Sequence, residues 1–194
     1  RASSRKRDCE PDSSRPRSWK VGVLCVLFAF LYTTGPYPLS YNGWGDVLVI
    51  VFFGFVPVGG TYYVQALTWT PDVTIASLIC GLLIDTLLVV NNYRDREADA
   101  RSGKRTVIVR FGEKFGRYFY LMLGVTASLL CLCFLREGHF LAALLPQLYL
   151  IPHFLTWKRM VKIYSGKKLN SILGETSRNM LFMGVLIAIG MLVS

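Results

Sequence analysis

The stretch at residues 91–106 reads NNYRDREADARSGKRT, and it follows directly on an apolar run, residues 73–90, that is long enough to cross a bilayer. Within it, Asn91, Asp95 and Asp99 are spaced i, i+4 and i+8. If the helix continues through them, each step turns by only about 40°, so their oxygens form one stripe. Carboxylates one turn apart, beside an amide oxygen, suit Mg²⁺, which leaves its other positions to water and substrate phosphates. We therefore predict that Asn91, Asp95 and Asp99 bind Mg²⁺ and that the two aspartates are catalytic.

Basic residues accompany this stripe, as expected if the metal carries a phosphate group. Lys104 and Arg105 follow the flexible Gly103 and are predicted to contact phosphate, and Arg94 and Arg110 are further candidates. The alternative is that these cations only orient the protein in the membrane. The alternative for the two aspartates is a solvated acidic face that balances Arg94, Arg96 and Arg101, and Asn91 could merely cap or pack.

The composition predicts an all-α, polytopic membrane helical bundle. Hydrophobic residues make up 53% of the chain and charged residues 18%, and the mean hydropathy is +0.41. The apolar residues come in long blocks and not in amphipathic stripes, which is typical of membrane spans. The net charge is +10, but the basic residues lie beside the apolar blocks. This placement indicates membrane orientation and phosphate binding, with no nucleic-acid partner.

Six apolar blocks predict about six transmembrane helices. A polar, basic tail at residues 1–18 precedes them and is predicted to be disordered. Polar connections are expected at 34–45, 107–117 and 158–168. The predicted spans are residues 19–33, 46–67, 73–93, 118–135, 139–157 and 169–193.

The charge of the loops predicts the orientation of the spans. The loops 94–117 and 158–168 are both strongly basic and are two spans apart, so they lie on one side, which the positive-inside rule makes cytoplasmic. Counting back three spans places the basic tail 1–18 outside, against the rule. Either the first block does not span, or this N-terminus is not a natural one.

Several stretches together resemble one family of membrane enzymes. The sequence at 91–106, followed by VRFG at 109–112, resembles the second acidic motif of the UbiA superfamily of intramembrane prenyltransferases. The flanking stretches YTTGPYPLSYNGWGD (32–46), GTYYVQ (60–65) and LNSILGETSRN (169–179) add to the match. The GKRT ending is most similar to the MenA branch, the 1,4-dihydroxy-2-naphthoate polyprenyltransferases of menaquinone synthesis. The similarity covers residues 19–194, which then correspond to the C-terminal part of a UbiA-type domain.

The resemblance implies a nine-helix fold with a cytoplasm-facing cavity and two Asp-rich motifs that hold Mg²⁺ between them. This chain would supply the last six helices and lack the first motif, so we expect it to be inactive alone. The implied substrates are polyprenyl diphosphate and 1,4-dihydroxy-2-naphthoate, which give demethylmenaquinone, diphosphate and CO₂. The implied location is the bacterial cytoplasmic (inner) membrane, with the lipid bilayer as partner.

The remaining polar residues have more than one interpretation. Tyr62, Tyr63 and Gln65, together with Asn92, could line the aromatic-acceptor pocket, although interfacial anchoring explains the tyrosines equally well. Asp85 lies within a span and is expected to make an interhelical hydrogen bond, while Asp46 stands alone at a helix start.

Three other functions remain open at this point. Polar residues in kinked helices also build transporters and ion channels, but there the charges lie near the bilayer midplane, whereas here they cluster at one edge. A prenyltransferase for another aromatic acceptor is the second alternative. The third is a truncated, inactive membrane fragment.

Overall fold

The computed structural model of the protein describes residue 23 and residues 42–193. The predicted disordered tail, 1–18, lies outside the described residues, as does the predicted first span, 19–33, apart from residue 23. All regular secondary structure within 42–193 is helical, which confirms the predicted all-α class.

The helices follow one another with short connections. Several spans change helix type along their length, because α, 3₁₀ and π segments join end to end. The segments are α2 (Gly45–Val49), the π-helix η2 (Ile50–Gly59), α3 (Gly60–Ala66), α4 (Pro71–Arg101), α5 (Val107–Leu130), the 3₁₀ helix η3 (Cys131–Glu137), α6 (Phe140–Leu144), the 3₁₀ helix η4 (Leu145–Tyr149), α7 (Leu150–Ile163), the 3₁₀ helix η5 (Lys167–Leu169) and α8 (Asn170–Val193).

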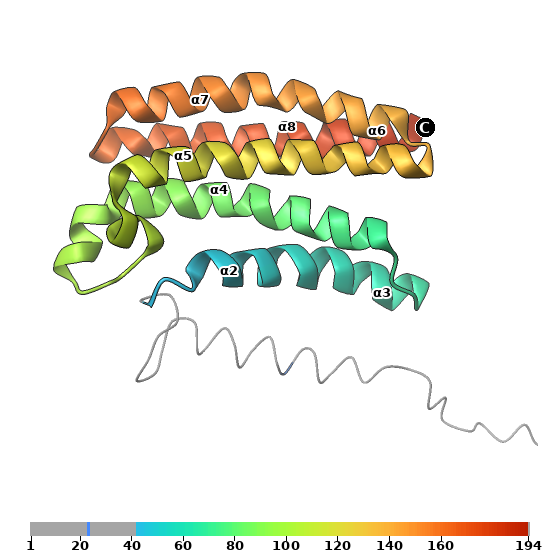
Figure 1. The fold of residues 1–194 in the computed structure, drawn as a ribbon, viewed down its shortest axis with the longest axis horizontal. Helices are drawn as coiled ribbons and strands as arrows, with labels where there is room; N and C mark the ends of the chain where they lie inside the picture. The colour runs from blue at the N-terminus through green and yellow to red at the C-terminus, as the bar shows by residue number, and fades with distance from the viewer. Residues whose placement is uncertain (1–22, 24–41, 194) are drawn as a thin grey trace, which may run out of the picture.

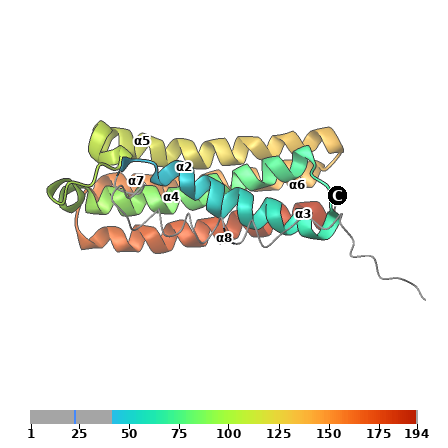
Figure 2. The same ribbon diagram turned by 90° about the horizontal axis from the view of Figure 1, so that it is seen from below.

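These segments form a bundle of rods that run side by side (Figures 1 and 2). Five stretches in the described part are long and apolar enough to cross a membrane, and large apolar side chains such as Leu181 and Leu192 remain exposed, as expected for surfaces that face lipid. This confirms the polytopic membrane fold. The five stretches are Gly45–Ala66, Pro71–Arg101, Val107–Glu137, Phe140–Ile163 and Lys167–Val193.

Helix α4 is the centre of the bundle, because it packs against η2, α5 and α8. Its Val89, Val90 and Tyr93 are fully buried. The α4–α5 connection and the α7–α8 connection lie at the same end (left in Figure 1), so the two basic loops share one side, as their charge predicted.

The contact between η2 and α4 depends on small residues. A Cβ added to Gly54 would lie 2.4 Å from the Ser77 carbonyl oxygen, and one added to Gly81 would lie 2.8 Å from the Ile50 carbonyl oxygen. The backbones therefore touch, as small residues allow in membrane bundles. Near this contact, the Cys80 thiol of α4 donates to the Phe53 carbonyl oxygen of η2 at 3.6 Å.

We expect Gly54→Ala to destabilise the protein by about 1–3 kcal/mol, because the added methyl meets backbone atoms, which cannot move away as a side chain can. Gly184→Ala is the matched control: nothing lies within 4 Å of its added Cβ, and alanine is the better helix former. Thermal unfolding of both variants in detergent measures the difference. Equal melting temperatures would show that η2 and α4 are not in backbone contact.

Two predicted loops are wrong, because polar composition concealed their helical structure. Residues 107–117 form the first part of α5, whose start is capped by the Thr106 hydroxyl as it accepts from the Val109 N–H at 3.2 Å. The helix bends at Gly112, whose φ of 86° suits glycine. The loop predicted at 158–168 is also shorter than expected, since α7 continues to Ile163.

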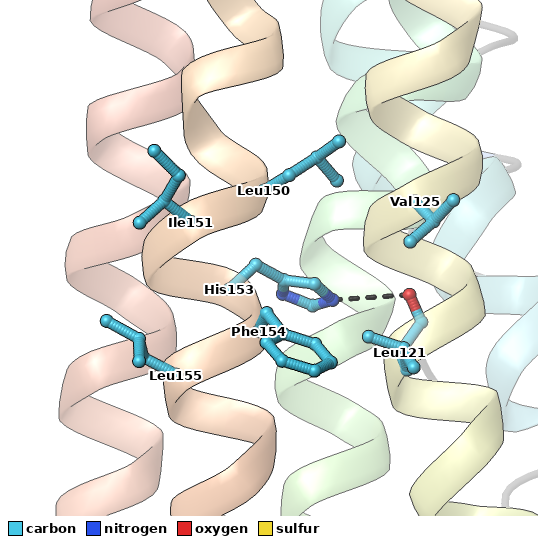
Figure 3. Close-up of a pocket in the computed structure, with 7 residues that line it drawn as sticks. All are labelled: Leu121, Val125, Leu150, Ile151, His153, Phe154 and Leu155. Atoms are coloured by element: carbon cyan, nitrogen blue, oxygen red, sulfur yellow. Dashed lines mark hydrogen bonds between the residues drawn. The ribbon is translucent and has the colours of Figure 1, made fainter.

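A buried polar group connects α5 and α7 within the bundle. His153 Nε2 donates to the Leu121 carbonyl oxygen at 3.3 Å, so its Nδ1 accepts from the Tyr149 hydroxyl at 2.9 Å. Figure 3 shows this ring at an apolar pocket of about 430 Å³. Ile151, Phe154 and Leu155 also line the pocket and are exposed, so it opens toward lipid and is distinct from the polar residues of α4.

Candidate active site

Helix α4 continues without a break through the predicted metal stripe. Thr70 caps its start, where the Thr70 hydroxyl accepts from the Val73 N–H at 3.3 Å, and the helix ends only at Arg101. Its 31 residues exceed the roughly 20 that cross a bilayer. The last turns, which carry Asn91, Asp95 and Asp99, therefore extend to the membrane surface in the predicted stripe.

The guanidinium group of Arg94 lies at the centre of this stripe. Its Nε and Nη2 donate to the two carboxylate oxygens of Asp95 at 2.7 and 2.6 Å. Nη2 also donates to Asn91 Oδ1 at 2.6 Å. Nη1 donates to Asn170 Oδ1, on α8, at 2.8 Å. Arg94 thus connects two predicted metal ligands to a second helix.

Asp99, the third predicted ligand, is paired with Lys104. The chain turns at Gly103, whose φ is 80°, and the Lys104 N–H donates to the Asp99 carbonyl oxygen at 2.9 Å. This turn brings Lys104 Nζ to 3.4 Å from Asp99 Oδ2. A cation is therefore held beside each of the two carboxylates.

The other two predicted phosphate contacts are placed differently. Arg105 is exposed beyond the end of α4. Arg110 is turned toward the chain before α2, where its Nη2 donates to the Asn42 carbonyl oxygen at 2.7 Å. The structure thus brings Arg94 and Lys104 onto the acidic stripe and places Arg110 beside a different segment.

A second charged cluster fixes the other side of the helix end. Arg96 lies over the rings of Tyr93 and Tyr164, with its guanidinium carbon 4.6 and 5.0 Å from their centroids. Arg117 Nε donates to the Tyr93 hydroxyl at 2.9 Å. Glu113 lies between the two arginines, 3.7 Å from Arg96 and 3.4 Å from Arg117. This cluster joins α4, α5 and the end of α7, so it holds the Asp95 stripe in a fixed direction.

The predicted acceptor pocket is not brought together. Tyr62 and Gln65 lie on α3, at the end of the bundle where α4 begins (right in Figure 1), and both are exposed. Asn92 is buried near the other end of α4, about 30 Å further along at 1.5 Å per residue. The notion that Asn92 shares a pocket with Tyr62 and Gln65 is therefore not supported within the described residues.

Asn170 and Asp85 both differ from what the sequence indicated. Sequence reasoning did not assign Asn170 to the site, although it belongs to the LNSILGETSRN stretch. Asp85 does not make the expected interhelical hydrogen bond, since neither of its buried carboxylate oxygens has a hydrogen-bond partner in residues 42–193.

The donor atoms of the stripe fit a hard cation that also binds a substrate. Within the described residues, no three His, Cys, Asp or Glu side chains gather as a metal cage. Asn91, Asp95 and Asp99 provide only two carboxylates and one amide oxygen. Mg²⁺ accepts such a partial protein set when water and phosphate oxygens complete its shell. Arg94 and Lys104 lie beside these ligands, where their positive charges would be close to a phosphate group bound to the metal.

These features define a membrane helical protein with a cluster of acidic and basic side chains at one end of a central helix. Residues 14–192 match the UbiA prenyltransferase family, so the chain belongs to that family.

The relatives found by sequence comparison carry related names. A 1,4-dihydroxy-2-naphthoate octaprenyltransferase of Haemophilus influenzae is 34% identical over 177 residues, which cover 89% of this chain and 56% of that protein. The Escherichia coli protein of the same name is 41% identical over 112 residues, 58% of this chain and 36% of that protein. UbiA prenyltransferase domain-containing protein 1 of Dictyostelium discoideum is 29% identical over 174 residues, 90% of this chain and 52% of that protein.

The chain spans about half the length of these relatives where the match is most extensive. No solved structure matches it.

Proposed function

We propose that the protein transfers a polyprenyl group from polyprenyl diphosphate to 1,4-dihydroxy-2-naphthoate. The bond between the prenyl carbon and the diphosphate oxygen breaks, a carbon–carbon bond forms to the ring, and the ring carboxylate leaves as CO₂. The observation that carries the proposal is the stripe of Asn91, Asp95 and Asp99 with cations beside it, at the end of a membrane-spanning helix. The names of the relatives support the acceptor.

Each residue of the site has a defined part in this reaction. Asn91, Asp95 and Asp99 would hold Mg²⁺, which when bound supplies Lewis-acid stabilisation of the leaving diphosphate. Arg94 and Lys104 would donate to phosphate oxygens, and their charges would favour the anion as it separates. The apolar surface of the bundle accommodates the prenyl chain within the bilayer.

Because this chain spans about half the length of its relatives, the direct test uses membranes that hold a complete UbiA-type domain containing this chain. It supplies polyprenyl diphosphate, Mg²⁺ and 1,4-dihydroxy-2-naphthoate. We expect a prenylated naphthol that lacks the carboxylate, together with CO₂, and we expect both to disappear when EDTA removes the metal. Product formation in EDTA would contradict the metal assignment. Prenylation of 4-hydroxybenzoate in place of the naphthoate would contradict the proposal that 1,4-dihydroxy-2-naphthoate is the acceptor.

We also propose that the site faces the cytoplasm of a bacterium, across its inner membrane. A cysteine introduced as Ser102→Cys, in a protein without its native cysteines, should react with a membrane-impermeant maleimide only from the cytoplasmic side. Glu137→Cys is the matched control. Glu137 is also exposed, but it lies at the far end of the span Val107–Glu137, whereas Ser102 lies just before the start of that span. Labelling in the reverse pattern would invert the orientation.

A further inference from the structure

A further inference comes from the ion pair in which Arg94 already binds the Asp95 carboxylate, a predicted metal ligand. Both oxygens of the Asp95 carboxylate accept from one guanidinium group, at 2.7 and 2.6 Å. The same group also holds Asn91 Oδ1 at 2.6 Å. Two of the three predicted metal ligands are therefore already bound to an internal cation. The pair is accessible, since 24% of the Arg94 side chain and 38% of the Asp95 side chain are exposed.

A guanidinium group and a divalent metal compete for these oxygens. Mg²⁺ requires its oxygen ligands at about 2.0–2.1 Å in near-octahedral directions, whereas the bidentate pair already directs both Asp95 oxygens toward nitrogen. A second cation placed there would also be repelled by the arginine charge. In the absence of the metal, on the other hand, Asp95 and Asp99 lie one turn apart with like charges, and Arg94 and Lys104 compensate both.

We propose that Arg94 is an exchangeable counter-ion, which leaves Asp95 when Mg²⁺ binds and pairs with the diphosphate that the metal brings. This inference rests on the proposed function. The exchange replaces one anionic partner of the guanidinium by another, and the planar fork of arginine fits phosphate as well as carboxylate. Metal and diphosphate then bind cooperatively, because the diphosphate compensates the cation that the metal displaces.

Asn170 is the residue that keeps the displaced arginine in the site. It lies at the start of α8, and its Oδ1 accepts from Arg94 Nη1, the nitrogen that does not contact Asp95. The guanidinium group can therefore turn away from Asp95 while it stays attached to α8. Arg94 and Asn170 are 76 positions apart in the chain, so the exchange would couple the end of α4 to α8.

The test measures metal binding to the purified chain in detergent by calorimetry, with Mg²⁺ alone and with Mg²⁺ plus inorganic diphosphate. With Mg²⁺ alone, Arg94→Gln should bind the metal about tenfold more tightly than the wild type, because the charged hydrogen bonds that compete for Asp95 are gone. With diphosphate present, this advantage should disappear or reverse, because the variant also lacks the phosphate partner. Arg101→Gln is the matched control: it removes the same charge from the exposed end of α4 and should leave the wild-type values unchanged.

The outcomes separate this inference from the proposed function. If Arg94→Gln binds Mg²⁺ alone no more tightly than the wild type, the exchange is wrong, while the metal site stands. If neither protein binds Mg²⁺, with or without diphosphate, the metal site and the exchange both fail. Should Arg94→Gln not fold, Arg94→Lys gives the test, because a lysine makes only a single contact to Asp95 and should give intermediate tightening. Wild-type affinity in a folded Arg94→Lys would then overturn the exchange.

Discussion

Asp95→Asn and Asp99→Asn are each expected to slow prenyl transfer by about 100-fold or more. Each substitution keeps the size of the side chain and removes one of the two carboxylates of the stripe. Metal Lewis acidity contributes several kcal/mol to stabilising a leaving anion, and each 1.4 kcal/mol corresponds to tenfold in rate. Initial rates with saturating polyprenyl diphosphate, measured over a range of Mg²⁺ concentrations, give the effect.

Glu97→Gln is the matched control for these two variants. Glu97 lies between Asp95 and Asp99 on the same helix, carries the same charge and is exposed, but two residues along a helix point about 200° away. Its activity should remain close to that of the wild type. If all three variants lose activity equally, the general negative charge at this end of α4 is what matters, and the assigned stripe is wrong.

Circular dichroism and gel filtration in detergent distinguish a lost ligand from a lost fold. The ion pairs broken by these variants are partly exposed, and such pairs typically contribute at most about 1 kcal/mol to stability. Helix content and melting temperature should therefore change little. A collapse of the fold in Asp95→Asn would instead assign Arg94 and Asp95 a mainly structural part between α4 and α8.

The stripe could be predicted because its spacing is local. An apolar run followed by oxygens at i, i+4 and i+8 requires only that one helix continue, and α4 does continue to Arg101. The common side of the two basic loops was predictable for a similar reason, since it follows from counting spans.

The partners of the stripe could not be predicted in the same way. The bond from Arg94 to Asn170 joins residues from different helices, and no periodicity near Arg94 points to α8. The same holds for Arg96 and Tyr164, which meet only because α7 ends beside α4. The helical residues 107–117 were missed because beyond the membrane a helix no longer needs an apolar sequence, and only the Thr106 cap marked its start.

The environment of Asp46 depends on Asp85, a residue of another helix that its sequence position does not reveal. By sequence it is an isolated acid at a helix start. In the structure, Gly81 of α4 packs onto Ile50, and one further turn along each of these antiparallel helices brings Asp85 level with Asp46. Asp85 is fully buried and Asp46 is 7% exposed, so like charges on the two carboxyl groups would repel each other there. Two acids thus face each other inside the bundle.

We expect Asp85→Asn to raise the free energy of unfolding by about 1–3 kcal/mol, because burial beside another acid disfavours an ionisable carboxyl group, whereas the amide has no charge to desolvate. Neither Asp85 oxygen has a hydrogen-bond partner in residues 42–193, and a carboxyl group opposite Asp46 adds repulsion between like charges whenever both ionise. The amide keeps the shape and removes the charge. Reversible unfolding in mixed detergent micelles measures the change.

Asp72→Asn makes the same chemical change at a site where the opposite sign is expected. Asp72 lies in the first turn of α4, where a negative charge is favourable by about 0.3–1 kcal/mol because it meets the positive end of the helix dipole. Its loss should lower stability slightly, while the loss of Asp85 raises it. If Asp85→Asn also lowers stability, then the Asp85 carboxyl has a partner that stabilises it, as in the interhelical hydrogen bond expected from the sequence. The facing pair with Asp46 would then hold α2 and α4 together instead of opposing their contact.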